Sequence, residues 1–552
     1  MPTFREKVGG FLRQLSTGQE KKPDYKSPCT SPTSTGSFIH KYLLGEVKKY
    51  HPEVLYGKSY YELPVKEIAP LSRTVLSACT GPQGGLTTVD LETKPFEFPD
   101  VDVHFIDEDH RDSSENLVKL KDIVQEDTYS SAHDDIEPWP DVNPSISDSN
   151  GESLKKAEIA GIKDWFSPCE SAYGIATTLY ECHPVTKENA GNPIADAFAV
   201  VMRENSALLV LADGVNWGEK SCLAARCAIH GCVNYLNKVL YREGAGDISS
   251  LDIFISLLRS FSEAHNLILH ENGTLTTLCA VVVAQLKKSN KFIACACNVG
   301  DSLAYIYSPK YGVREITQGS HDIYSMRDMR DALGALGPVD GINPELSNLT
   351  LSMSELDPDD IVFLASDGIS DNFDPVVGKF AIPRKIDKRS KTPTESQATT
   401  TIDPKGSNPV SPVNTQTEKE TFDIDLSLPV VEAHQRHELT LLRMEDLIIN
   451  GVNEGDSPCK TAQQICEQMI DFAEKLTIAK RRILEDPDLY KNDDMKVNQA
   501  GQRMRRRKVG EKLSMVPGKL DHASIVAYTV GARFEEKIPL IAECESYSDL
   551  KC

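Results

Sequence analysis

The chain has 552 residues, a formal net charge of -22 and a sequence pI near 5.1. This length allows a large core plus accessory regions, and the acidic charge argues against general nucleic-acid binding, which needs a basic face. No run of about 18 apolar residues occurs, so no membrane-spanning helix and no stable membrane insertion are expected. The N-terminus lacks the apolar segment of a signal peptide, which predicts an intracellular protein of the cytoplasm or nucleus.

The cysteines favour a reducing compartment. The chain has 14 of them, several inside apolar periodic segments, and none forms a CxxC pair. A zinc ribbon is therefore not expected, and reduced thiols in an intracellular protein are the preferred interpretation.

The N-terminal region, residues 1–160, is predicted to be largely disordered. Residues 1–37 are polar and rich in Ser, Thr and Pro, and residues 85–160 are acidic and rich in Ser and Asp. Between them, aromatic and aliphatic side chains predict a short ordered segment near residues 38–62 that docks as a helix.

Regular structure is predicted from about Trp165 onward. Strands are expected at Tyr173–Tyr180, Ala197–Met202, Leu208–Leu211, TTLCAVVVAQL, KFIACACNVG, LAYIYS, Ile361–Ala365 and Ser524–Val530. Helices are expected at Glu219–Leu240, Leu251–Leu269 and Ser457–Leu484. Runs of strands broken by a pair of helices predict an α+β layered sandwich rather than alternating βαβ units.

One long segment interrupts this pattern. Residues 384–420 have no apolar periodicity, which predicts a flexible surface insertion. The expected organisation is a folded domain at residues 165–532, interrupted by this insertion, with a C-terminal tail at 533–552. The basic run Gln502–Lys508 is interpreted as a solvated loop.

Two predicted strands end in an Asp-Gly pair. Leu208–Leu211 runs into Asp213-Gly214, and Ile361–Ala365 runs into Ser366 and then Asp367-Gly368. A carboxylate at the end of a buried strand, followed by a glycine that lets the backbone turn, is a typical position for a metal ligand. Asp-Gly is also the commonest turn dipeptide, so two simple turns remain an alternative at this point.

Further polar residues stand at the ends of other predicted strands. Asp196 lies just before the second strand, and Asp521 opens the last one. Gly300-Asp301-Ser302 follows an apolar strand, and a Thr-rich segment follows Gly273. Several carboxylates at strand ends favour a shared site over isolated turns.

The order of these elements resembles the metal-dependent protein phosphatases of type 2C (the PPM family), over roughly residues 165–532. The matching elements are Ala195-Asp196, Asp213–Trp217, Gly273–Thr277, Gly300–Ala304, Ser366–Asp371 and Asp521-His522. The resemblance implies a central β-sandwich of two antiparallel sheets flanked by helix pairs, with a two-metal centre at one end of the sheets.

The resemblance also implies a chemistry. Two Mg²⁺ or Mn²⁺ ions would be held by carboxylate oxygens, with Asp213 bridging them and the Gly214 carbonyl as an additional ligand. Asp367 and Asp521 would complete one ion, and Asp196 would serve the other, directly or through water. A metal-bridged hydroxide would hydrolyse a phosphomonoester, with Asp213, Asp367 and Asp521 as catalytic residues. A protein serine/threonine phosphatase acting as a monomer on phosphoproteins is the expected function.

Several positions depart from the family pattern. Ala195 replaces an acidic residue, Asn216-Trp217 replaces Gly-Gly, and His522 replaces Asn or Asp. No arginine lies between Gly174 and Asp196, where many relatives keep a phosphate-binding one.

Arg203 is the next candidate for that phosphate-binding role, and Leu303 occupies the place of another arginine. These departures support an alternative function, a catalytically weak or inactive pseudophosphatase that serves as a binding or scaffold module. The retention of Asp196, Asp213, Asp367 and Asp521 opposes it. An aspartyl nucleophile is disfavoured, because Val215 stands where a second Asp would be needed.

Overall fold

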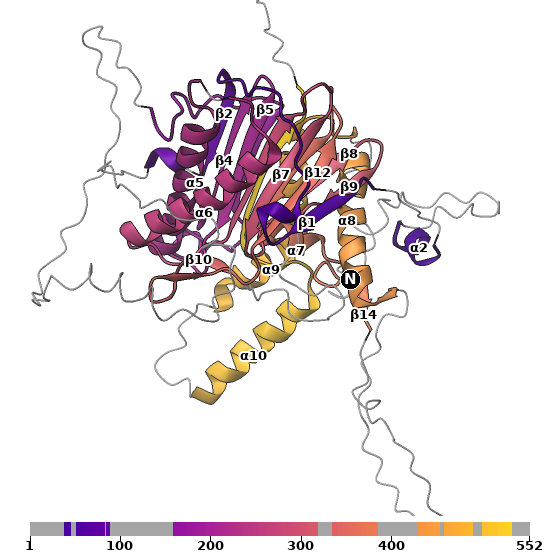
Figure 1. The fold of residues 1–552 in the computed structure, drawn as a ribbon. Coiled ribbons are helices and arrows are strands. Elements are labelled where there is room, and N and C mark those ends of the chain that lie inside the picture. The colour runs from indigo at the N-terminus through magenta and orange to yellow at the C-terminus, as the bar shows by residue number, and fades with distance from the viewer. Residues whose placement is uncertain are drawn as a thin grey trace, which may run out of the picture.

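The computed structural model describes residues 38–45, 51–82, 84–88, 158–244, 246–317, 334–384, 428–452, 457–489 and 499–532. Two antiparallel sheets lie face to face, and helices cover the outer face of each (Figure 1). The predicted α+β sandwich flanked by helices is confirmed.

The larger sheet has seven strands in the order β1-β12-β7-β6-β5-β4-β2, and every neighbouring pair is antiparallel. Its strands are β1 (Val54–Gly57), β2 (Val75–Gly81), β4 (Asp196–Arg203), β5 (Ser206–Asp213), β6 (Leu278–Gln285), β7 (Phe292–Val299) and β12 (Thr350–Leu356). The smaller sheet has five strands in the order β3-β16-β13-β8-β9. They are β3 (Ala172–Thr178), β8 (Leu303–Ser308), β9 (Gly312–Glu315), β13 (Ile361–Ala365) and β16 (His522–Thr529).

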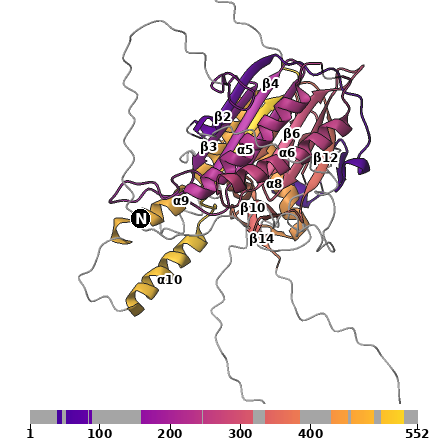
Figure 2. The same cartoon turned by 60° about the vertical axis from the view of Figure 1, so that its left-hand side comes forward.

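Helices form the two outer layers. The paired helices α5 (Glu219–Leu240) and α6 (Ser250–His270) pack on the larger sheet (Figure 2). On the smaller sheet, α9 (Ala462–Leu484) packs against β3 and β16, and α8 (Ala433–Asn450) packs against β9. The other described helices are α2 (Phe38–Leu43), α7 (Asp367–Phe373) and α10 (Gln499–Met515), and the 3₁₀ turns are η1 (Tyr60–Glu62), η2 (Gly85–Thr88) and η3 (Pro487–Leu489). Two further strand pairs are β10 (Ala335–Asp340) with β11 (Asn343–Glu345) and β14 (Ile382–Pro383) with β15 (Val430–Val431).

The central strand β5 shows why its sequence is apolar without alternation. Leu209 and Leu211 face the smaller sheet and join the core between the sheets. Leu208 and Val210 face α5 and α6 and join the core under those helices. Because the strand is covered on both faces, each of these side chains stabilises the fold by roughly 1.5–3 kcal/mol. The predicted strand buried on both faces is confirmed.

The N-terminal part of the chain contributes more structure than its sequence indicated. The segment near residues 38–62 contains the short helix α2 as expected, but also strand β1 and turn η1. Strands β1 and β2 form the two edges of the larger sheet, although both precede residue 165. The domain limits of 165 and 532 remain a prediction, to which the structure adds these two edge strands.

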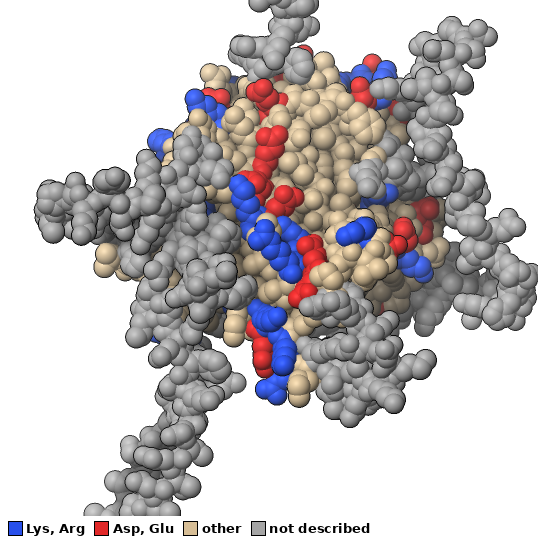
Figure 3. Space-filling model, turned by 180° about the vertical axis from the view of Figure 1, so that it is seen from behind, with Lys and Arg blue, Asp and Glu red and all other residues tan. Residues whose placement is uncertain are grey.

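Three of the described helices were not predicted, and the first of them is the short helix α7 after β13. Helix α8 follows the insertion, and the basic run Gln502–Lys508 belongs to helix α10 rather than to a loop. Arg507 and Lys508 are exposed, and Arg507 pairs with Glu511 at 3.0 Å. On the face opposite to that of Figure 1, basic and acidic side chains lie interspersed (Figure 3).

Most of the segments predicted to be disordered lie outside the described residues. These are 1–37, residues 89–157 of the predicted stretch 85–160, the C-terminal tail from 533 and residues 385–420 of the insertion. The start of the second stretch, Gly85–Thr88, forms the turn η2 instead. The two ends of that insertion meet, because β14 and β15 pair in parallel and the Arg384 backbone N–H donates to the Val431 carbonyl at 2.9 Å. No helix among the described residues is long and apolar enough to span a membrane.

Candidate active site

Six aspartates meet where one end of the larger sheet lies against the smaller sheet. Asp196 begins β4 and pairs in register with Asp213 at the end of β5. Asp301 follows β7, Asp367 opens α7 directly after β13, and Asp521 precedes β16. The sixth, Asp371, lies one turn along α7 from Asp367. The structure therefore brings together all four predicted aspartates and adds Asp301 and Asp371.

Burial and mutual repulsion raise the pKa of most of these carboxyls. Burial and the charges of Asp196, Asp367, Asp521 and Asp301 raise the pKa of Asp213 well above its ordinary value. Burial likewise raises the pKa of Asp196 to about 6, of Asp371 to about 7 and of Asp301 to about 8. A group of carboxylates in so little water is stable only with positive charge among them.

On one side of the cluster, which we call the Asp196 half, the carboxylate has no cation beside it. Asp196 is fully buried, and neither of its carboxylate oxygens has a hydrogen-bond partner of good geometry. Gly214 follows Asp213 where the chain passes within contact of two carbonyls. A Cβ at that position would lie 2.5 Å from the Ser221 oxygen and 2.8 Å from the Ala195 oxygen, so only glycine fits.

Threonines from the Gly273–Thr277 segment hold Asp213 in place. The Thr276 hydroxyl donates to the Asp213 carbonyl at 2.9 Å, and the Asp213 backbone N–H donates to Thr277 Oγ1 at 3.0 Å. Thr277 Oγ1 also lies 2.7 Å from Ser302 Oγ. Two of the motif elements found in the sequence thus support the central aspartate from neighbouring strands.

On the other side, which we call the Lys519 half, a lysine joins three carboxylates. Lys519 Nζ contacts Asp367 Oδ2 and lies 2.9 Å from Asp371 Oδ2 and 3.0 Å from Asp521 Oδ2. Burial alone would lower the pKa of Lys519, but Asp371, Asp367 and Asp521 together outweigh it and raise the pKa well above its ordinary value. Lys519 is therefore a cation within the site.

Asp521 is also held by an aromatic group at the rim. Its Oδ1 accepts hydrogen bonds from the Tyr180 hydroxyl at 3.1 Å and from the His522 backbone N–H at 2.9 Å. The Trp217 indole N–H donates to the Tyr180 oxygen at 2.9 Å, and the two rings meet edge to face at 4.5 Å. Trp217 is 57% exposed, so it lies at the rim of the cluster.

His522 serves the backbone around Asp196. Its Nδ1 accepts from the Ala195 backbone N–H at 3.4 Å, and its Nε2 lies 2.6 Å from the Gly191 carbonyl. These partners assign the neutral tautomer with the proton on Nε2, because a backbone N–H can only donate and a carbonyl can only accept. His522 therefore positions the chain before β4.

Arg203 is not placed to bind a phosphate at this cluster. It ends β4, seven residues after Asp196, which at about 3.3 Å per residue puts the two roughly 23 Å apart. Its guanidinium is buried, donates to Asn237 Oδ1 at 2.8 Å and lies 3.6 Å from the centre of the Tyr241 ring. The proposed role of Arg203 as the next phosphate-binding candidate is wrong, because the strand carries it to the far end of the sheet.

The cluster fits a divalent ion in one half only. No group of three or more His, Cys, Asp or Glu side chains in the described part of the chain is arranged to hold a metal. The Asp196 half nevertheless supplies hard oxygen donors without partners, which is what Mg²⁺ and Mn²⁺ prefer. In the Lys519 half, the same carboxylate oxygens that an ion would need contact an ammonium group.

Sequence reasoning identified some of these residues but not others. Asp301 and Asp371 lay within the quoted motifs without being assigned to the site. Lys519 and Tyr180 were not proposed as site residues at all. Lys519 stands two residues before Asp521, and that spacing was the one available signal.

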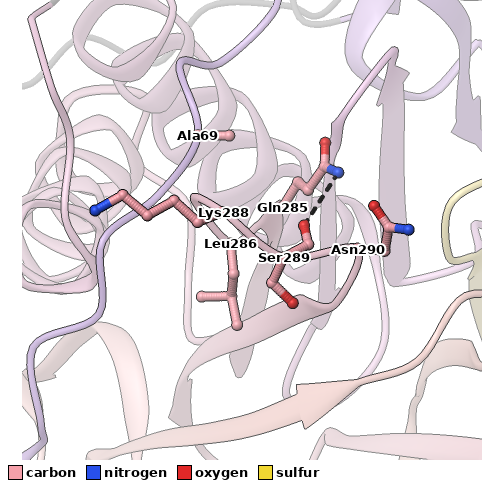
Figure 4. A pocket seen from close by; sticks show the side chains of 6 residues that line it. All are labelled: Ala69, Gln285, Leu286, Lys288, Ser289 and Asn290. Carbon is pink, nitrogen blue, oxygen red and sulfur yellow. Dashed lines mark hydrogen bonds between the residues drawn. The ribbon is translucent and has the colours of Figure 1, made fainter.

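A surface hollow elsewhere has no connection with this cluster. Gln285, Leu286, Ser289 and Asn290 line it at the turn between β6 and β7 (Figure 4). The turn follows the end of β6 that is remote from Thr277 and Asp213. The hollow holds no cluster of chemical groups comparable to the aspartates.

Comparison with known proteins agrees with the motif order. The family model described as protein phosphatase 2C matches residues 186–402. The PP2C-like domain-containing protein CG9801 of Drosophila melanogaster is 33% identical over an alignment of 679 residues, which covers 96% of this chain and 96% of that protein. The chain belongs to the protein phosphatase 2C family. The predicted family is thereby confirmed.

Solved structures of phosphatases are also similar to the protein phosphatase 2C chain described here. The Mycobacterium tuberculosis serine/threonine phosphatase PstP has 18% identity and a TM-score of 0.25, covering 37% of this chain and 81% of its own. The SiaA-PP2C domain of Pseudomonas aeruginosa has 11% identity and a TM-score of 0.28, covering 65% and 86%. The family match at 186–402 contains five of the six aspartates, while Asp521 and Lys519 lie beyond it.

Proposed function

We propose that this protein phosphatase 2C chain is a metal-dependent protein serine/threonine phosphatase of low turnover. The observation that carries the proposal is the convergence of six aspartates at one end of the sandwich, with Asp196 and Asp213 directly opposed on neighbouring strands. Phosphomonoesters on phosphoproteins are the proposed substrates.

The sequence implied two Mg²⁺ or Mn²⁺ ions, and the two halves support them unequally. Asp196, Asp213 and the Gly214 carbonyl would hold one ion. The family resemblance assigns the other to Asp367, Asp521 and Asp213, but two of these carboxylates already contact Lys519, so this position has weaker support. A bound divalent ion supplies an activated water and neutralises charge on the phosphate oxygens.

The remaining residues position these groups. Thr276 and Thr277 fix the backbone of Asp213, and Tyr180 fixes the carboxylate of Asp521. Arg203 does not take the phosphate-binding role that it was considered for, because its guanidinium lies at the far end of β4. Losing one positioned charge contact in a desolvated site costs on the order of 10²–10³ in rate, which is the reason for expecting low turnover.

Phosphate release from an aryl phosphate and from phosphopeptides by the full chain, with and without Mn²⁺, tests this proposal. Asp213→Asn should abolish the Mn²⁺-dependent release. Asp471→Asn is a matched control, because Asp471 lies on α9, is about half exposed and pairs with Lys475 at 2.8 Å. A wild-type rate no higher than that of Asp213→Asn would refute the phosphatase.

A second function, a pseudophosphatase that binds partners without hydrolysis, has its own support. Lys519 already provides positive charge in the cluster, and Trp217 and Asn216 stand where the family pattern has two glycines. Under this alternative the protein would bind a phosphoprotein and leave its phosphate intact. Tight binding of a phosphopeptide without phosphate release would favour it over the enzyme.

A further inference from the structure

Lys519 enters the aspartate cluster from a short loop between α10 and β16. Its ammonium meets carboxylates from two different segments, Asp367 and Asp371 of α7 and Asp521 before β16. The side chain of Lys519 is only 17% exposed, and that of Asp371 only 6%. A lysine with three carboxylate partners at this depth is a part of the site and not a surface ion pair.

The backbone of Lys519 is fixed by the same helix that carries two of its partners. The Lys519 backbone N–H donates to Asn372 Oδ1 at 2.8 Å, and Asn372 Nδ2 donates to the Lys519 carbonyl at 3.1 Å. Asn372 is fully buried, and its Nδ2 also donates to the Gly368 carbonyl at 2.7 Å. The buried amide of Asn372 therefore ties the loop to α7 through both the N–H and the carbonyl of Lys519.

The residue before Lys519 is held as firmly. Gly518 has a φ of +91°, and a Cβ there would lie 2.8 Å from Thr477 Cγ2. Its N–H donates to the Val377 carbonyl at 3.0 Å, and its carbonyl accepts from Lys480 Nζ. Because the loop is fixed at two consecutive residues, the direction of the Lys519 side chain follows from the fold.

The ammonium and a metal ion would compete for the same atoms. Lys519 contacts Oδ2 of Asp367 and Oδ2 of Asp521, and the other oxygen of Asp521 is taken by Tyr180 and the His522 backbone. Only Asp367 Oδ1 of these two carboxylates is left without a hydrogen-bond partner, and one oxygen does not make an ion site. An ion bound between Asp367 and Asp521 would stand within contact of Lys519 Nζ. Two cations at that separation repel strongly in a buried site, so only one of them can remain.

We propose that Lys519 is a resident cation that takes the place of one of the two divalent ions, so that the wild-type chain binds a single ion, in the Asp196 half. This inference rests on the proposed function for one point, the assignment of one ion position to Asp196 and Asp213 and of the other to Asp367 and Asp521. An ammonium carries one positive charge and only donates hydrogen bonds, so it neutralises carboxylates without supplying the second charge of Mg²⁺ or Mn²⁺.

The test is the number of Mn²⁺ ions bound per full-length chain, measured by isothermal titration calorimetry and by electron paramagnetic resonance of free Mn²⁺. The wild-type chain should bind one ion, and Lys519→Met, which keeps most of the side-chain length without the charge, should bind two. Lys512→Met is the matched control, since Lys512 is exposed on α10 and should leave one ion bound.

Two bound ions in the wild-type chain would overturn the inference, whatever the variant does. One ion in both the wild type and a folded Lys519→Met variant would overturn it as well. Phosphate release is a separate readout. If Lys519→Met binds two ions where the wild type binds one, and neither protein releases phosphate, the inference stands and the proposed phosphatase activity is refuted. If the wild type binds two ions and releases phosphate, the inference is refuted and the phosphatase activity stands.

Discussion

The two halves of the aspartate cluster share Asp213 but solve the problem of buried charge differently. In the Lys519 half, three carboxylates surround an ammonium group. In the Asp196 half, neither oxygen of a fully buried carboxylate accepts a hydrogen bond of good geometry, although the Ser366 and Ser524 side chains lie close to it. The Lys519 half therefore carries its own cation, although Asp367 Oδ1 has no hydrogen-bond partner there, whereas the Asp196 half needs a ligand that brings positive charge.

The difference has an energetic consequence. An unpaired buried carboxylate destabilises the folded protein, so neutralising it should raise the unfolding free energy. Removal of one partner of a buried ion pair has the opposite effect, because it leaves the other charge buried and unpaired. The two halves should therefore respond in opposite directions when their charged residues are neutralised.

Lys519→Met should destabilise the metal-free protein by about 3–5 kcal/mol, because it leaves three carboxylates without their cation. Urea denaturation with and without Mn²⁺ measures this loss, and added Mn²⁺ should restore much of it. Lys512→Met is the control, and its unfolding free energy should stay close to that of the wild type. An unchanged unfolding free energy in Lys519→Met would mean that the two halves do not differ in charge pairing.

A buried histidine outside both halves contributes to the acid dependence of the fold. Burial, aided by Lys238, lowers the pKa of His230 from 6.5 to about 4. Between these values the unfolded chain takes up a proton that the folded chain does not, so stability is lost as the pH falls. The loss should approach about 3 kcal/mol at acid pH and be absent in His230→Leu. The measurement is the unfolding free energy of the wild type and of His230→Leu between pH 7 and pH 4. The same dependence on pH in both proteins would contradict this role of His230. A difference between them would assign part of the pH effect to helix α5 and not to the aspartate cluster.

Asp196→Asn should stabilise the metal-free protein by about 1–2 kcal/mol, because it removes a buried charge that accepts no hydrogen bond of good geometry. The same change should weaken Mn²⁺ binding, and the two effects together distinguish a ligand from a structural residue. Urea denaturation and calorimetry at pH 7 measure both. Destabilisation of the metal-free protein would show that Asp196 is already compensated within the fold.

The insertion offers the smallest expected effect. Replacing residues 385–427 with a short Gly/Ser linker should change the unfolding free energy by no more than about 1 kcal/mol, since a loop costs only about 0.6 kcal/mol per doubling of its length. The flanking strands β14 and β15 are already paired, so a short linker can close the gap. A large drop in melting temperature would show that the segment packs on the domain.

The sequence predicted those elements whose pattern is local. Helix α5 begins and ends at the predicted residues Glu219 and Leu240, because its apolar face repeats with helical spacing. Strand β2 was missed because VLSACTG mixes Ser, Cys and Thr with apolar residues, as suits a partly exposed edge strand. Its place beside β4 depends on pairing across more than 100 residues of sequence, which no local pattern reveals.

The site was predictable to the extent that strand ends mark it. Asp213 and Asp367 were found because each follows an apolar run and precedes a glycine. Gly368 shows why that glycine is needed, since a Cβ there would lie 1.8 Å from the His522 carbonyl oxygen. Lys519 could not be assigned in this way, because its direction is set by Asn372, which lies 147 residues earlier in the chain.

The central claim is that the wild-type cluster holds one divalent ion and one lysine. Anomalous diffraction from crystals of the protein grown with Mn²⁺ tests it most directly. One Mn²⁺ peak beside Asp196 and Asp213, with Lys519 still between Asp367, Asp371 and Asp521, is the predicted result. Two peaks, with Lys519 turned away from the cluster, would contradict it.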